Sequence, residues 1–229
     1  MRRENSPHTT RVKIVAARLR GELAAPIVRC MASLVWIWAD ESCLGVQFVD
    51  RDSPGGAAGM IEHWTGGRWV RRDYWLSDPA TTNNRMALQS AIAGLSLLHR
   101  PCQVVFTSDS QYLVRGMREW IHAWSRRGWK RKGGAIENEG LWKELADAAR
   151  RHRVDWRWVR GHAGHPHNEY ANHLATRAAR DQGRSAGLVE SGFTAWLEQQ
   201  RQERERYLDF FEWQEPADDA FEPVPAVPA

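Results

Sequence analysis

The sequence predicts an α/β domain in which a mixed β-sheet carries helices on its faces. Ser33 to Asp40 is a run of bulky and β-branched apolar residues, which is typical of a buried strand. Thr65-Gly66-Gly67 separates two strand-like segments, as in a β-hairpin. From Asn83 to His99 the apolar residues recur at helical spacing, and strand-like and helical patterns then alternate up to Asp181. This order predicts a sheet covered by helices.

The first half of the chain supplies three predicted strands and one helix. After the strand at 33–40 comes a segment rich in Asp, Ser, Pro and Gly, which predicts a loop over 41–59. The two hairpin strands are expected at 57–64 and 69–76. The helix at 83–99 is expected to end before Pro101, because proline cannot continue a helix.

The second half of the chain supplies two more strands among several helices. The expected elements, in order, are a strand at 104–107, a helix starting at 110–117, a helix with a basic end at 120–129, an amphipathic helix at 138–152, a strand at 154–159 and a helix at 166–181. The last of these begins with Pro166, a residue that the first turn of a helix tolerates.

Residues 33–183 are predicted to form one domain flanked by two arms. A basic N-terminal arm, 1–32, is expected because residues 1–33 hold seven Arg and Lys against two Glu. Aromatic residues in 184–215 predict a C-terminal helical extension that packs on the domain or on a protein partner. The tail, 216–229, is rich in Pro, Ala and acidic residues and is expected to be disordered.

Charge and composition narrow the class of protein. Residues 184–229 carry four Arg against ten Asp and Glu, while the rest of the chain is basic. A basic domain with a basic arm favours a polyanionic ligand, although both arms could equally be solvated surface. No stretch of about 18 apolar residues is present, and no secretion signal is recognised. We therefore expect a soluble, cytoplasmic protein that does not bind membranes, with its three cysteines as free buried thiols.

Two acidic residues follow predicted strands and are candidates for a metal or phosphate site. Asp40 ends the apolar run Trp36-Ile37-Trp38-Ala39, and Asp109 follows Val104-Val105-Phe106-Thr107-Ser108. Carboxylate oxygens are the ligands that Mg²⁺ prefers. The alternative is that each aspartate is a turn or helix-capping residue, since Asp109 directly precedes a predicted helix.

Five blocks of the sequence resemble type 1 ribonuclease H in the order in which that family has them. They are Asp40-Glu41-Ser42-Cys43-Leu44-Gly45, Thr81-Thr82-Asn83-Asn84-Arg85-Met86-Ala87-Leu88, Thr107-Ser108-Asp109-Ser110-Gln111-Tyr112, Trp120-Ile121-His122-Ala123-Trp124-Ser125-Arg126-Arg127-Gly128-Trp129-Lys130 and Trp158-Val159-Arg160-Gly161-His162-Ala163-Gly164-His165-Pro166-His167-Asn168-Glu169. The resemblance implies a five-stranded mixed sheet of order 3-2-1-4-5, helices on both faces and a basic helical protrusion. It also implies cleavage of the RNA strand of RNA–DNA hybrids.

The resemblance implies a metal site made by four carboxylates, of which this sequence has two. The family positions fall on Asp40, Ala87, Asp109 and Asn172. Ala87 replaces a glutamate and Asn172 an aspartate, so Asp40 and Asp109 are the expected ligands of a weakly bound Mg²⁺, with Mn²⁺ as the alternative metal. Glu41 or Glu169 could compensate. Strand alternation, however, predicts that the side chain of Glu41 faces away from Asp40.

The residues that would hold the nucleic acid are better preserved. His162 matches the histidine that shuttles protons or releases product in the family, and Asn168 is expected to support the site by hydrogen bonding. The other family positions that contact nucleic acid are, in this sequence, Asn83, Asn84, Gln111, Trp124, Arg126, Arg127 and Lys130. The tryptophans of the protrusion could instead serve only to pack it together.

These observations lead to a ribonuclease H-like protein that binds RNA–DNA hybrid or a related duplex, with impaired or absent cleavage of the RNA strand. The alternative is an active Mg²⁺-dependent hybrid endoribonuclease whose metal site is compensated by other residues. A third reading is a scaffold that contacts proteins through its arms and has no affinity for hybrid.

Overall fold

The computed structural model describes residues 34–45, 53–131, 133–211 and 221–227 of the chain; the predicted basic arm, 1–32, lies outside them. The elements, in chain order, are β1 (Leu34–Cys43), β2 (Ser53–Thr65), β3 (Arg68–Thr81), α1 (Asn83–Ser96), β4 (Gln103–Ser108), α2 (Gln111–Arg115), the π-helical turn η1 (Gly116–Trp120), α3 (Ile121–Arg126), α4 (Glu139–Ala149), β5 (Arg153–Trp158), α5 (Pro166–Asp181), β6 (Val189–Glu190) and α6 (Phe193–Arg204).

The strands form one mixed sheet of order β5-β4-β1-β2-β3-β6. β1 runs parallel to β4 and antiparallel to β2, so the α/β class and the order 3-2-1-4-5 of the first five strands are confirmed. The predicted number of five strands is wrong. The two-residue strand β6 pairs Val189 with Asp73 and Glu190 with Arg72, along the edge of β3. That pairing occupies backbone groups at a sheet edge, which makes the addition favourable.

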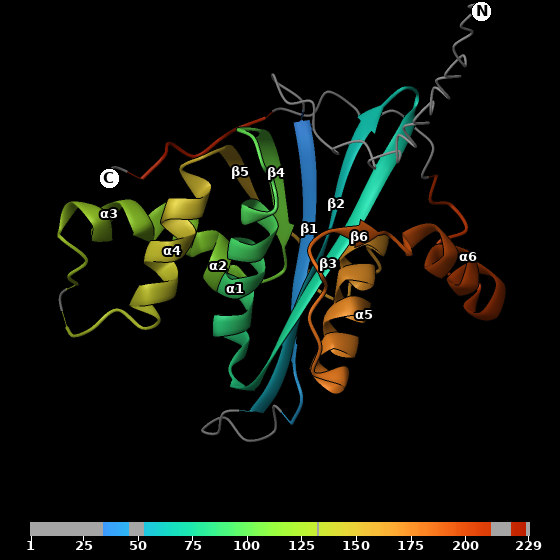
Figure 1. The fold of residues 1–229 in the computed structure, drawn as a ribbon, viewed down its shortest axis with the longest axis horizontal. Helices are drawn as coiled ribbons and strands as arrows, with labels where there is room; N and C mark the ends of the chain where they lie inside the picture. Colours follow the sequence, from blue (N-terminus) through green and yellow to red (C-terminus); the bar gives the residue numbers. More distant parts are fainter. Residues whose placement is uncertain (1–33, 46–52, 132, 212–220, 228–229) are drawn as a thin grey trace, which may run out of the picture.

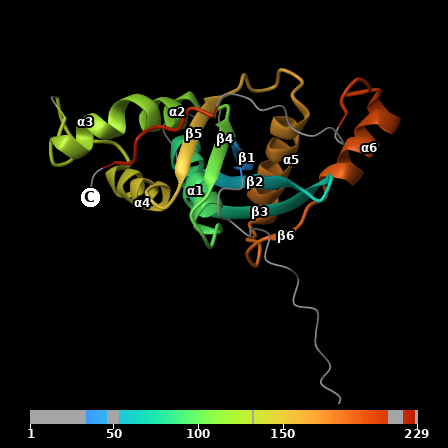
Figure 2. The ribbon, with the colours of Figure 1, turned by 90° about the horizontal axis from the view of Figure 1, so that it is seen from above.

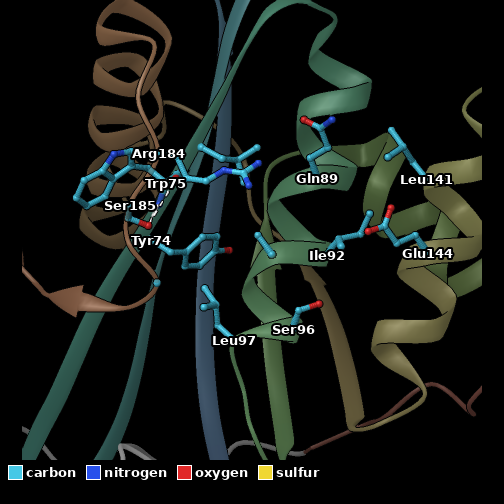
Figure 3. Close-up of a pocket in the computed structure, with 13 residues that line it drawn as sticks. Tyr74, Trp75, Gln89, Ile92, Ser96, Leu97, Leu141, Glu144, Arg184 and Ser185 are labelled. Carbon is cyan, nitrogen blue, oxygen red and sulfur yellow. Dashed lines mark hydrogen bonds between the residues drawn. The ribbon is translucent and has the colours of Figure 1, made fainter. Parts of the chain in front are cut away.

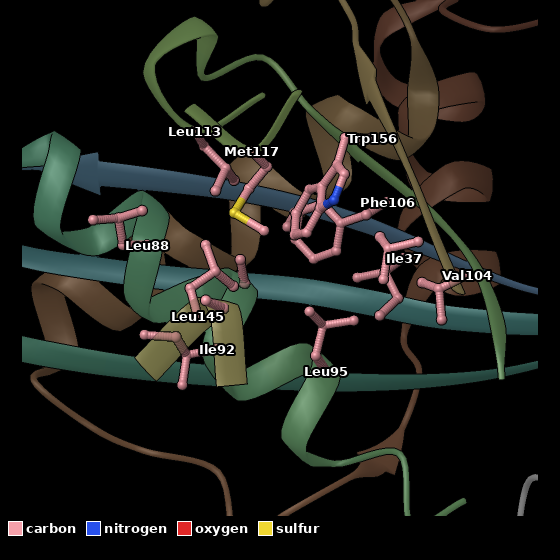
Figure 4. Packing of buried hydrophobic residues seen from close by; sticks show 14 of the residues in the cluster. Ile37, Leu88, Ile92, Leu95, Val104, Phe106, Leu113, Met117, Leu145 and Trp156 are labelled. Carbon is pink, nitrogen blue, oxygen red and sulfur yellow. The ribbon is translucent and has the colours of Figure 1, made fainter. Parts of the chain in front are cut away.

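Helices cover both faces of the sheet (Figure 1). α1 to α4 lie on one side of it, and α5 and α6 lie on the other. The main hydrophobic core fills the space under the first group; Figure 4 shows Ile37 and Phe106 of neighbouring strands facing Leu95 of α1 and Leu145 of α4. On the opposite face, a side chain at Gly56 would run into the backbone of α5. Glycine therefore lets α5 lie directly against the sheet, beside β1.

β1 and β2 extend further than the sequence pattern predicted. The expected loop at 41–59 is wrong at both ends, because Cys43 pairs with Gly55 and β2 begins at Ser53. The turn-like composition of this segment has another cause: glycines at 55 and 56 sit in a strand where side chains have no room. Asp40 and Glu41 thus lie inside a paired strand rather than at its end.

The C-terminal extension packs on the domain through the aromatic and apolar residues of α6. α6 places Phe193, Trp196 and Leu197 in a second hydrophobic cluster with Tyr170 of α5. The tail, 216–229, was expected to be disordered, but its described part, 221–227, contacts the domain. Val224 forms a β-bridge with Val154 of β5, and Val227 is buried in the main core. Figure 2 shows these last described residues on the β5 side of the sheet, passing from β5 towards α4, far from α6.

None of the helices in the described part of the chain combines the length and the hydropathy that crossing a lipid bilayer requires.

Candidate active site

The parallel pairing of β1 and β4 brings the two predicted aspartates together. Ala39 of β1 is the register partner of Ser108, the last residue of β4. The residues that come next, Asp40 and Asp109, therefore lie side by side. Asp109 is held at the start of α2, where the Ser110 side chain caps the helix by accepting from Leu113 N at 3.4 Å. The sheet topology therefore positions both carboxylates at one point.

A third carboxylate, that of Glu41, joins them. One ligand oxygen from each of Asp40, Glu41 and Asp109 lies within 4.8 Å of the others, a cluster that we call the acidic triad. Strand alternation predicted that Glu41 faces away from Asp40, yet its carboxylate lies with that of Asp40. Backbone alternation does separate the two Cβ directions. The longer glutamate side chain, however, still reaches the point where Asp40 and Asp109 meet.

The substitution at position 87 is on the side of the sheet that Glu41 occupies. Glu41 is two residues after Ala39 in β1, so the two side chains point to the same face of the sheet. Ala39 packs in the same core cluster as Ala87 of α1, which is 1% exposed. The short side chain of Ala87 and the carboxylate of Glu41 therefore belong to the same side of the sheet.

Asparagine amides orient the triad without adding charge. Asp40 accepts hydrogen bonds from the backbone N of Glu41 at 2.6 Å and from Asn168 Nδ2 at 3.2 Å. The amide of Asn172 lowers the pKa of Asp40, and the amide of Asn168 lowers the pKa of Asp109, although burial outweighs both effects. The predicted supporting role of Asn168 matches this geometry. Asn172 occupies its family place but contributes a neutral group.

The triad holds more negative charge than its protein surroundings offset. Burial raises the pKa of Asp40 well above its usual range, and the charge of Asp109 raises it further. Burial likewise raises the pKa of Glu41, helped by Asp40 and Asp109, and burial raises the pKa of Asp109. Among the described residues, no Lys or Arg forms an ion pair with any of the three.

The donor set fits a divalent cation. Oε2 of Glu41 is buried and has no hydrogen-bond partner within the described ranges. A buried carboxylate oxygen without a partner is costly unless a cation binds it. Three hard oxygen donors converging on one point are what Mg²⁺ or Mn²⁺ takes as ligands.

His162 lies beside the triad on an exposed loop. Its charge lowers the pKa of Asp109, although burial outweighs this effect. The neighbouring Gly161 has no side chain where one would overlap the Asp109 carboxylate, so the loop can approach closely. Nothing in the sequence except the Gly-His pair itself indicated this packing role of Gly161. His162 thus lies close enough to Asp109 for its charge to act on that carboxylate.

The predicted nucleic-acid contacts occupy helix starts and the protrusion. Asn83 and Asn84 begin α1, and Gln111 begins α2, with Asn83 and Gln111 exposed. Arg126, Arg127 and Lys130 are exposed at and after the end of α3. The structure thus leaves these side chains open to a ligand, and their binding role stays a prediction.

Trp124 differs from its basic neighbours in the protrusion. Its ring packs against Trp142 at 5.5 Å and Trp120 at 5.8 Å between centroids, and it is partly buried. Trp124 therefore helps to pack the protrusion together, which is the alternative role that the sequence left open for its tryptophans.

A separate cavity of about 490 Å³ lies between β3, α1, α4 and the start of the extension. Figure 3 shows Tyr74, Gln89 and Glu144 along its walls. It includes none of the acidic triad, so the candidate active site is the triad rather than this cavity.

Comparison with known proteins agrees with the geometry. The family model described as RNase H matches residues 32–180. Ribonuclease H of Granulibacter bethesdensis is 44% identical over 148 residues, covering 64% of this chain and 93% of its own. Ribonuclease HI of Caulobacter vibrioides is 44% identical over 151 residues, covering 66% and 95%.

Among solved structures, LC9-RNase H1 is described as a type 1 RNase H with the type 2 active-site motif. It is 46% identical, with a TM-score of 0.76, covering 88% of this chain and 96% of that one. The RNase H domain of PFV, at 15% identity and a TM-score of 0.54, shares the fold. The chain therefore belongs to the RNase H family.

Proposed function

We propose that this protein is an active, divalent-metal-dependent endoribonuclease that cleaves the RNA strand of RNA–DNA hybrids, with Glu41 in place of the carboxylate that Ala87 lacks. The observation that carries the proposal is the acidic triad, with its unpartnered Glu41 oxygen. The similarity to LC9-RNase H1, a type 1 enzyme described as having the type 2 motif, supports the view that ligands can move within this fold.

In the proposed reaction, the protein positions the reactants and handles protons. Asp40, Glu41 and Asp109 would hold Mg²⁺, which when bound activates water and stabilises charge on phosphate oxygens. Asn168 keeps the Asp40 carboxylate in one orientation by donating a hydrogen bond to it. His162, exposed beside Asp109, can pass a proton to the departing 3′-oxygen or to solvent.

Substrate selection would come from the exposed polar groups around the triad. Asn83, Asn84 and Gln111 lie at helix starts and can reach hydroxyls and base edges in the minor groove, where 2′-hydroxyls identify RNA. Arg126, Arg127 and Lys130 can neutralise phosphates of the DNA strand, which makes binding sensitive to salt.

The competing function is a hybrid-binding protein with impaired or absent cleavage. Asn172 favours it, because an amide in the place of the fourth carboxylate lowers the negative charge available to hold two cations. Three carboxylates still supply a ligand set for Mg²⁺, which is why we prefer the active enzyme.

A cleavage assay separates the two functions. The RNA strand of a labelled hybrid is incubated with the full chain and Mg²⁺ or Mn²⁺, next to Glu41→Gln and the control Glu139→Gln, whose side chain pairs with Lys143 on exposed α4. We expect cleavage by the parent and the control, and a loss of at least about 100-fold in Glu41→Gln. Salt-sensitive binding by the parent without any cleavage would establish the competing function.

A further inference from the structure

An arginine of the C-terminal extension reaches the vicinity of the triad. Nη2 of Arg206 lies 3.8 Å from Oε1 of Glu169, and the side chain of Glu169 is 16% exposed. Glu169 directly follows Asn168, whose amide bonds to Asp40. The ion pair therefore links the extension to the helix that supports the proposed metal centre.

The negative charge of Glu169, which is outside the triad, acts on Asp40 and Asp109. Burial is the main reason that the pKa values of Asp40 and Asp109 are raised, and the negative charge of Glu169 raises both further. Its carboxylate is not one of the three that converge. Glu169 is therefore close enough to act on the triad by charge, while its pairing with Arg206 directs it toward the extension.

The backbone of the extension holds Arg206 in place. Arg206 lies between Glu205 and Tyr207, which have φ of 51° and 59°, a left-handed conformation that non-glycine residues rarely adopt. Arg206 N donates to Gln200 O at 3.3 Å, and Arg201 Nε donates to Tyr207 O at 3.3 Å. These contacts make the turn after α6 specific rather than free.

Two further contacts fix the arginine side chain and its surroundings. The guanidinium carbon of Arg206 lies 4.8 Å from the centre of the Tyr207 ring. Tyr207 and Phe210 also line a cavity of about 440 Å³ together with Arg160 and His165, from the loop that carries His162. The turn after α6 is thus a wall beside the active-site loop.

We infer that Arg206 is a positioning residue for the proposed metal centre: it keeps the Glu169 carboxylate out of the ligand set and offsets its charge next to the bound phosphate backbone. This inference rests on the proposed function, because it assumes that the triad binds a divalent cation and that hybrid lies against it.

Loss of the arginine is expected to act through Glu169, strengthening the binding of Mg²⁺ and weakening the binding of hybrid. In Arg206→Gln, the released carboxylate can approach the cation, so the Mg²⁺ concentration needed for half-saturation falls about 3- to 10-fold. Without metal, the unpaired carboxylate repels phosphates, so hybrid binding weakens about 3- to 10-fold. Arg206→Lys keeps the charge and is expected to stay near the parent.

The test measures binding rather than turnover. Hybrid affinity is determined in chelator, and Mg²⁺ affinity from the rise in melting temperature of the nucleic-acid-free protein, for Arg206→Gln, Glu169→Gln and the double variant. The matched control is Arg204→Gln, which removes the same charge from the exposed last residue of α6. The expected result is that Arg206→Gln has little effect once Glu169 is Gln, and that Arg204→Gln does little in either background.

Equal effects of Arg204→Gln and Arg206→Gln would overturn the inference, because both would then result from the change in the net charge of the protein and not from the ion pair with Glu169. Persistence of the Arg206→Gln effect in the Glu169→Gln background would overturn it as well. A parent protein that binds hybrid and Mg²⁺ but never cuts would refute the proposed function and leave these binding comparisons intact.

Discussion

The buried carboxylate of Glu62 and the acidic triad differ in the charges that surround them. Glu62 of β2 accepts from Trp38 Nε1 at 2.9 Å and Arg71 Nε at 2.8 Å, and lies 3.2 Å from His167 Nε2. The acidic triad, a few residues further along β1, has amide and backbone donors but no arginine or lysine partner in the described part of the chain.

The pKa values record this difference. Burial alone would raise the pKa of Glu62, but His167 and Arg71 together lower it to about 2. In the triad, burial and mutual repulsion raise the pKa values. A buried carboxylate with an internal cation contributes to the stability of the fold, whereas carboxylates that face one another without one form a set of oxygen donors that fits a cation.

The largest expected effect comes from removing a charge of the triad. Asp109→Asn keeps the shape of the side chain but removes a metal ligand, so hybrid cleavage with Mg²⁺ is expected to fall at least about 1,000-fold. Asp147→Asn, on the exposed surface of α4, serves as the control and should cleave normally. Full cleavage by Asp109→Asn would show that the triad is not the metal centre.

Breaking the paired carboxylate is expected to affect the fold instead. Glu62→Gln removes a buried charge, 2% exposed, that accepts from Arg71 and Trp38 and lies against His167, and should lower the free energy of unfolding by about 3 kcal/mol. Urea unfolding of Glu62→Gln measures this, with Glu139→Gln on exposed α4 as the matched change, expected to cost less than about 1 kcal/mol. A cost for Glu62→Gln no greater than the control's would contradict the structural role.

The pH dependence of stability should have opposite signs in the two regions. Because the folded-state pKa of Glu62 is depressed, its contribution is present above pH 4.5 and is lost as the pH falls toward 2. The triad carboxylates have raised pKa values, so the metal-free folded state binds more protons than the unfolded state. Its stability therefore falls as the pH rises above about 4.

Thermal unfolding in chelator across pH 3 to 8 measures both contributions. The decline toward neutral pH should be smaller in Glu41→Gln than in the parent, and Mg²⁺ should reverse it in the parent. An identical pH profile for parent and Glu41→Gln would show that Glu41 ionises as it does in the unfolded chain.

The smallest expected effect is that of moving a carboxylate from strand to helix. Since Glu41 and Ala87 are on the same side of β1, the double variant Glu41→Gln with Ala87→Glu should recover activity to within about tenfold of the parent, a difference of about 1.4 kcal/mol in the barrier. The control, Glu41→Gln with Ala87→Gln, should remain inactive. Failure of the first variant to exceed the control would show that position 87 cannot reach the cation in this chain.

Local patterns in the sequence were sufficient for most of the fold. The helix that starts at Pro166 was predicted with the bounds that the structure has, because its proline start and apolar spacing are local signals. The bounds of β2 were not predictable in this way, since glycines at 55 and 56 resemble a turn until Thr81, Cys43 and Met86 pack against the first and α5 against the second. The same holds for β6 and for Val224, whose pairing depends on sheet edges far away in the chain.

The sequence by itself indicated the family and the positions of Asp40 and Asp109, because these depend on motifs read along the chain, and the resemblance to the family implied the sheet order of the first five strands. Only the tertiary structure decided that Glu41 completes the acidic triad and that Arg206 meets Glu169. The reach of a long side chain and the convergence of distant segments depend on where neighbouring strands and helices lie. Alternation along one strand could not show that a glutamate on the opposite face would still meet two aspartates.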